Sequence, residues 1–159
     1  DMGAWRFTDE SAAKEFGHDT LVHVDGFTPF AAISLDLGNP HTVVALPPEI
    51  DLESLDLSGA PLLNPVAPNG SNVEFVRPLG PGHIRMRVHE RGVGETRSCG
   101  TGACAAALAT SFWATGQVED FDEWVVDVPG GTLRVGALPG QRVELSGPAV
   151  LVAEGTARL

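Results

Sequence analysis

The chain has 159 residues, of which 43% are hydrophobic, and a formal net charge of −11 at pH 7. These values are typical of one globular domain with a real core, and they argue against a disordered or a membrane protein. Nucleic acids and anionic membranes recruit clustered Lys and Arg, so the acidic balance also argues against both as partners. The only two cysteines lie five positions apart, which is not the framework of a disulfide-rich secreted domain. We therefore expect a reducing, cytoplasmic location.

Short β-prone runs dominate the chain, and Gly- and Pro-bearing turns such as "GNP", "PLGPG" and "PGG" separate them. In chain order, the predicted elements are a helix at 9–16, strands at 20–24, 30–35 and 41–46, a short helix at 51–57, strands at 72–76 and 83–90, a helix at 101–115, and strands at 123–128, 132–138, 142–146 and 149–154.

The helix predicted at 101–115 has the sequence "TGACAAALATSFWAT" and is followed by Gly116, a typical C-terminal stop. Its residues are apolar or small on every side, and a helix without a polar face must be buried all round. Nine strands and one buried helix predict an α+β fold in which a barrel-like mixed sheet wraps around a central helix.

Cys99 precedes this helix within the glycine-rich stretch "ERGVGETRSCGTGAC". The first N–H groups of a helix lack internal partners and carry partial positive charge, which should lower the pKa of a thiol there. Free cysteines are usually small core residues, and we interpret Cys104 in that way because it points to roughly the other side of the helix. The flanking glycines favour a reactive thiol at Cys99, with N–H groups that can hold a carboxylate.

A metal site and a disulfide are both disfavoured. The two sulfurs point apart on the helix, and the five histidines follow no ligand spacing. The sequence therefore predicts no bound metal.

Polar side chains gather at the turns and strand ends of "GNPH", "NVEF" and "HERG". Each group alone could be an ordinary turn or a surface ion pair. Together they suit a ligand that carries a carboxylate and an amine, with an arginine for the former and amide and carboxylate side chains for the latter. The candidate residues are Asn39, His41, Asn72, Glu90 and Arg91.

The segments "GNPH", "NVEFV", "RVHERGVGETRSCGTGACAAALA" and "PGGTLRV" resemble, in this order, the second half of diaminopimelate epimerase. The resemblance implies that residues 1–159 are the C-terminal domain of a two-domain epimerase whose N-terminal domain lies outside this chain. It implies conversion of LL-diaminopimelate to meso-diaminopimelate in lysine and peptidoglycan biosynthesis. Two cysteines would act on opposite faces of the α-carbon, without a cofactor, in a homodimer.

The resemblance also implies roles for individual residues. Cys99 corresponds to one catalytic cysteine, and His41 and Glu90 to residues that tune the pKa of the cysteines. Substrate contacts are implied for Asn39, Asn72, Glu90, Arg91, Gly100 and Thr101. The second cysteine of the family lies in the first domain, so we expect this chain to be inactive alone.

The sequence supports a cofactor-independent reaction separately. Pyridoxal phosphate needs a Schiff-base lysine, and the only lysine is Lys14, in the short helix predicted at 9–16. Two alternatives remain: a proline-racemase-like enzyme, which also uses two cysteines, and a non-catalytic module that binds an amino acid or only dimerises. The series from "GNPH" through "NVEF" to "ERG" favours the diaminopimelate enzyme.

Overall fold

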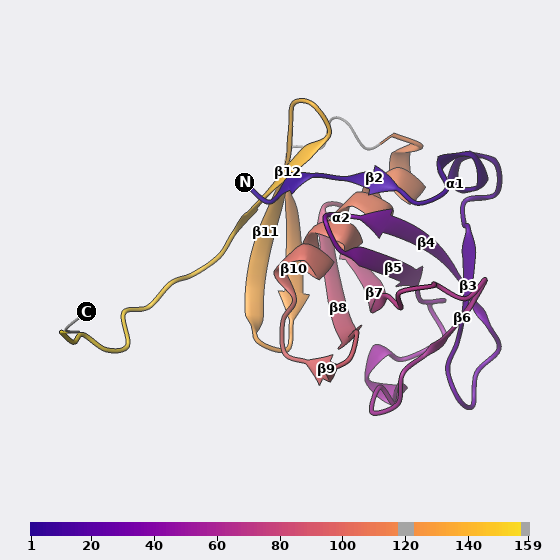
Figure 1. Ribbon diagram of the computed structural model, residues 1–159, viewed down its shortest axis with the longest axis horizontal. Helices are drawn as coiled ribbons and strands as arrows, with labels where there is room; N and C mark the ends of the chain where they lie inside the picture. The colour runs from indigo at the N-terminus through magenta and orange to yellow at the C-terminus, as the bar shows by residue number, and fades with distance from the viewer. Residues whose placement is uncertain (118–122, 157–159) are drawn as a thin grey trace.

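A computed structural model describes residues 1–117 and 123–156, which form a twelve-stranded mixed β-sheet with two α-helices and one 3-10 helix (Figure 1). The elements are β1 (Gly3–Ala4), β2 (Arg6–Phe7), α1 (Glu10–Phe16), β3 (Thr20–His23), β4 (Phe30–Asp36), β5 (Pro40–Ala45), η1 (Leu52–Ser54), β6 (Leu62–Asn64), β7 (Asn72–Gly80), β8 (His83–Glu90), β9 (Gly94–Thr96), α2 (Gly100–Thr115), β10 (Trp124–Val128), β11 (Gly131–Leu138) and β12 (Arg142–Ser146).

The sheet has the order β1-β12-β11-β10-β8-β7-β5-β4-β3-β6, with β2 paired to β4 and β9 paired to β8. The β5–β7 and β8–β10 pairs are parallel, and the other pairs are antiparallel. In the β5–β7 register His41 lies opposite Asn72, and in the β7–β8 register Val73 lies opposite His89. The start of β5, the start of β7 and the end of β8 therefore lie side by side, where these three neighbouring strands begin or end.

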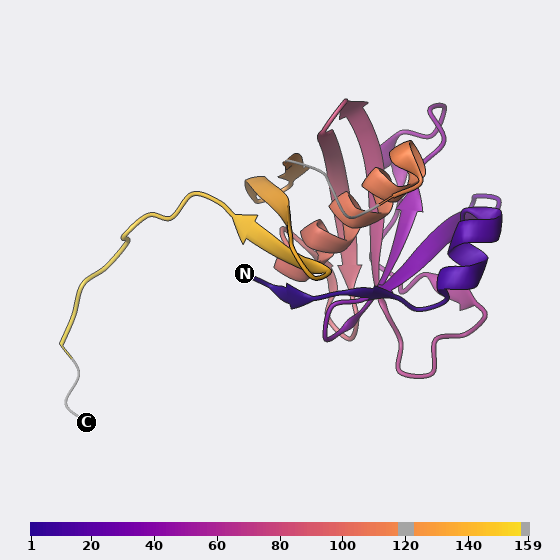
Figure 2. The same ribbon diagram turned by 90° about the horizontal axis from the view of Figure 1, so that it is seen from above.

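Helix α2 is buried on all sides, as its sequence predicted. Every residue from Gly102 to Phe112 is buried, and the helix contacts β5, β7, β8, β10, β11 and β12 (Figure 2). Gly116 ends the helix in the left-handed conformation with φ 72°, where its N–H donates to the Phe112 carbonyl. Small alanine side chains allow the strands to approach the helix closely.

The strand pairings of the described residues run from β1 to β6 without joining these two ends. The structure is thus a mixed sheet with a buried helix against it, and the barrel-like closure around α2 stays a prediction.

The sheet buries both of its faces in the middle. Val43 packs in the core that contains α2, whereas its neighbour Val44 packs in a second core on the other face. Leu52, Leu55 and Leu57 of the η1 segment cover this second core. Burial on both faces explains why four consecutive residues of β5, from His41 to Val44, are buried rather than every second one.

Two predicted elements were wrong. The helix predicted at 51–57 is only the 3-10 turn η1. The run predicted as a strand at 149–154 pairs with no strand of the described residues. The four additional strands β1, β2, β6 and β9 have only two or three residues each.

None of the helices in the two described ranges is long and apolar enough to cross a membrane.

Candidate active site

Cys99 is the N-cap of α2, with an extended backbone at φ −130° and ψ 116°. Its carbonyl accepts the first helical hydrogen bond, from the N–H of Ala103 at 2.9 Å, while its side chain makes no capping bond. The sulfur is half-buried and lies 3.7 Å from the Thr101 hydroxyl oxygen. The predicted position of a thiol at the helix start is therefore confirmed.

The predicted decrease in the pKa of this thiol was wrong. Burial raises the pKa of Cys99, and the nearby Glu74 and Glu90 carboxylates raise it further. The Thr101 hydroxyl, 3.7 Å from the sulfur, and the nearby Gly102 N–H oppose this increase but do not cancel it. The loss of thiolate hydration on burial thus raises the pKa by more than the position at the helix start lowers it.

Cys104 is a packing residue, as predicted. It is fully buried among the alanines of α2, and burial raises its pKa to about 12. A thiol in that state is protonated and closed to solvent.

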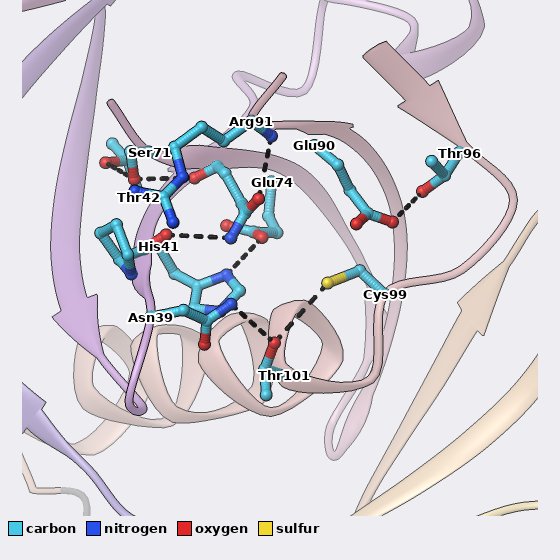
Figure 3. A network of polar contacts seen from close by, with 12 residues as sticks. Asn39, His41, Thr42, Ser71, Glu74, Glu90, Arg91, Thr96, Cys99 and Thr101 are labelled. Carbon is cyan, nitrogen blue, oxygen red and sulfur yellow. Dashed lines mark hydrogen bonds and ion pairs between the residues drawn. The ribbon is translucent and has the colours of Figure 1, made fainter. Parts of the chain in front are cut away.

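The turn before β5 reaches the start of α2. The Asn39 side-chain amide donates to the Thr101 hydroxyl oxygen at 3.3 Å across 62 positions of sequence. Gly38 permits this turn because its φ is 88°, in the left-handed region. Two of the predicted substrate contacts therefore lie beside the thiol (Figure 3).

His41 is fully buried, and its partner is Glu74 rather than Glu90. The His41 Nδ1 lies 2.7 Å from the Glu74 Oε1, and neither side chain has any exposed surface. Glu74 projects from β7, the parallel neighbour of β5. In the described residues, neither the His41 Nε2 nor the Glu74 Oε2 has a hydrogen-bond partner.

We expected His41 and Glu90 to lie together beside Cys99. Glu90 does lie near Cys99, whose pKa its carboxylate raises, but it does not pair with His41 and accepts a short hydrogen bond from the Thr96 hydroxyl, across the β8–β9 hairpin. Glu74 occupies the position facing the imidazole because β7, and not β8, is the neighbour of β5. Sequence reasoning missed Glu74, although a carboxylate between Val73 and Phe75 in an apolar strand was a usable signal.

Asn72 and Arg91 form a second group at the same strand ends. The Asn72 side-chain oxygen accepts from the Arg91 backbone N–H at 2.9 Å, and its amide donates to the Pro40 carbonyl at 3.0 Å. The exposed Arg91 guanidinium donates to the Asn69 carbonyl at 2.7 Å.

An open cleft of about 720 Å³ borders this group, which is within the usual size of small-molecule sites. Asn39, His41 and Arg91 are among its lining residues, whereas Cys99 lies outside the lining. Asn39 and Arg91 thus border a cleft, and the thiol lies outside its lining, at the start of α2.

The chain is a mixed α+β domain in which a half-buried thiol at a helix start lies near a buried His–Glu pair. This arrangement defines a class of thiol-bearing domains suited to acid–base chemistry. The family model described as diaminopimelate epimerase matches residues 33–152. This chain belongs to the diaminopimelate epimerase family.

Individual relatives carry the same name. The diaminopimelate epimerase of Streptomyces coelicolor is 48% identical over 139 residues, which cover 82% of this chain and 46% of that protein. That of Rhodococcus jostii is 45% identical over 159 residues, covering 98% and 50%. That of Pseudomonas aeruginosa is 44% identical over 133 residues, covering 81% and 45%. The chain spans about half the length of these curated relatives.

Proposed function

We propose that this chain is the C-terminal domain of a two-domain diaminopimelate epimerase. The complete protein would convert LL-diaminopimelate to meso-diaminopimelate in lysine and peptidoglycan biosynthesis, without a cofactor. One observation carries the proposal: in a chain of this family, Cys99 stands at the start of α2 beside the Asn39–Thr101 contact and the buried His41–Glu74 pair.

The proposed reaction inverts one stereocentre by two proton transfers. A thiolate on one face takes the α-proton, and a thiol on the opposite face delivers a proton to the same carbon. The thiol ends as a thiolate and the thiolate ends as a thiol, so protons balance. Cys99 supplies one of these groups. We propose that a cysteine of an N-terminal domain supplies the other, because Cys104 is sealed in α2.

The substrate carboxylate needs a positive partner. We assign this role to Arg91 together with the N–H groups at Gly100 and Thr101, which begin α2 and have no helical acceptor. The amide groups of Asn39 and Asn72 and the carboxylate of Glu90 would hold the amine.

Three wider features belong to the same proposal. The sheet would wrap around α2 as a barrel-like half of the enzyme, and the protein would act as a homodimer. Because both cysteines are free, we place the protein in the reducing cytoplasm. Light scattering on the complete protein tests the dimer.

Proton exchange in D₂O tests the reaction. The complete protein should incorporate deuterium at the α-carbon of diaminopimelate and interconvert the two isomers, and the Cys99→Ser variant should not. This chain alone should give no more turnover than its own Cys99→Ser variant, since one thiol serves only one face of the α-carbon.

The same assay separates the alternatives. Exchange into proline but not diaminopimelate would identify a proline-racemase-like enzyme. Binding of diaminopimelate in a calorimeter without exchange would identify a non-catalytic module.

A further inference from the structure

The His41–Glu74 pair occupies an unusual position for two ionisable side chains. Both are fully removed from solvent, and a buried ion pair is costly because two groups lose their hydration. One nitrogen and one oxygen of the pair also lack partners in the described residues. Such a pair contributes little net stability, so we expect the residues around it to indicate a functional role.

The surroundings lead from Glu74 to Cys99 through Gly102. A Cβ atom built on Gly102 would lie 2.7 Å from the Glu74 Oε1 and 3.2 Å from the Cys99 sulfur. The carboxylate oxygen and the sulfur therefore border the same small space, which exists because residue 102 has no side chain. Figure 3 shows His41, Glu74 and Cys99 converging above the first turn of α2.

We propose that Glu74 is a positioning residue for Cys99, and that the His41–Glu74 pair acts through the gap at Gly102 to hold the Cys99 side chain as the protonated thiol. The oxygen that faces this gap is the one bonded to His41, so the imidazole fixes the carboxylate in place. This role deepens the proposed function, on which it rests, because it makes Cys99 the proton donor of the resting site.

Electrostatics supports this direction. The titratable groups around the sulfur are Glu74 from β7, Glu90 from the end of β8 and Cys104 from α2 itself, while His41 from β5 stands behind Glu74. Burial and both carboxylates raise the pKa of Cys99. The negative end of the buried pair is thus the end that meets the thiol, and a thiolate there would be disfavoured by like charge.

The pH dependence of Cys99 alkylation by iodoacetamide on this chain tests the proposal. Glu74→Gln keeps the shape and can still hydrogen-bond to His41, but it removes the charge. The midpoint of the rate profile should move to lower pH. Labelling at neutral pH should become about threefold faster, because the gain in thiolate exceeds its loss of nucleophilicity.

The matched control is Glu15→Gln on the exposed face of α1, which makes the same charge change and should leave the midpoint in place. A Glu74→Gln variant that labels faster at every pH with an unchanged midpoint has only opened access to the sulfur, and that result overturns the proposal. An unchanged profile overturns it as well.

A measurement on the unaltered chain covers the case in which Glu74→Gln does not fold. The carboxyl carbon signal of ¹³C-labelled Glu74 should shift in a step with the same midpoint as Cys99 alkylation, and Cys99→Ser should remove that step. Absence of the step in the unaltered chain overturns the proposal. Neither readout needs turnover, so failure of the epimerase assay and failure of this proposal are separate results.

Discussion

At the scale of single residues, two opposing effects set the state of Cys99. The N-terminus of a helix stabilises a nearby negative charge by about 0.3–1 kcal/mol, and by up to about 2 kcal/mol in partly buried sites. Burial of an ionisable group can cost several kcal/mol, and the Glu74 and Glu90 carboxylates act in the same direction. The sequence revealed the helix start but not the carboxylate behind it, so it predicted the wrong sign.

We predict that Cys99 is nevertheless the reactive thiol of this chain. Its sulfur is half-buried, whereas Cys104 is sealed in α2 with a pKa of about 12. Because only the thiolate is alkylated and burial raises the pKa of Cys99, labelling should be slow at pH 7 and accelerate as the pH rises. Brief iodoacetamide treatment followed by peptide mass spectrometry should find Cys99 modified first at every pH. Equal labelling of Cys104 would mean that α2 opens in solution.

Arg91 should matter for substrate rather than for folding. In the complete protein, Arg91→Ala should lower kcat/KM by an amount equal to about 2–4 kcal/mol of lost transition-state stabilisation, since the substrate carboxylate would lose its charged partner.

Arg77→Ala is the matched control for Arg91→Ala. The Arg77 guanidinium also donates to a backbone carbonyl, that of Pro48 at 2.8 Å, but Arg77 does not line the cleft. Both variants should unfold at similar denaturant concentrations. A change in kcat/KM below about threefold for Arg91→Ala would leave Arg91 a structural surface charge.

At the scale of elements, the sequence predicted what depends on local pattern. Eight of the strands and helix α2 were found near their predicted positions, because period-two runs and an alanine-rich segment identify them locally. Strands such as β1 and β9 are too short to show any period, and they exist only through their partners β12 and β8. Glu74 escaped for a related reason: its partner His41 is 33 positions away in sequence.

The substitution Gly102→Ala tests how tightly the start of α2 is packed. Alanine has the higher helix propensity by about 1 kcal/mol, yet its Cβ would meet the buried Glu74 carboxylate and the Cys99 sulfur at distances that force a shift. We expect Gly102→Ala to destabilise this chain by about 1–3 kcal/mol, as overpacking does.

Gly100→Ala is the control for this element. Its Cβ would approach the side-chain ends of Leu145 and Met2, at 3.1 and 3.7 Å, which are only partly buried and can move. Urea unfolding should therefore show little change for Gly100→Ala. If Gly102→Ala proves equally stable, the space between Glu74 and Cys99 is wider than the structure shows.

At the scale of the whole molecule, the chain spans about half the length of its curated relatives. The motifs around Cys99 carried enough information to predict the family, because they hold the thiol and several of the predicted substrate contacts in one continuous segment. They could not predict the order of the twelve strands, since β5 pairs with β7 and β8 with β10 across long connections. The path of residues 147–156 was also beyond local pattern, because the β-prone run within it pairs with no strand of the described residues.

A test of whether the segment after β12 contributes to stability is therefore possible at Val150, Leu151 and Val152. They are 79%, 76% and 90% exposed, and they follow β12 without pairing to any strand. Replacing all three with serine should leave the free energy of unfolding of this chain within about 0.5 kcal/mol, because almost no apolar surface is lost from the core. Val143→Ala, in the neighbouring strand β12, removes a fully buried side chain and should cost about 2 kcal/mol. Urea denaturation of the two variants measures both values. A triple variant that loses as much stability as Val143→Ala would mean that this segment packs against the sheet in solution.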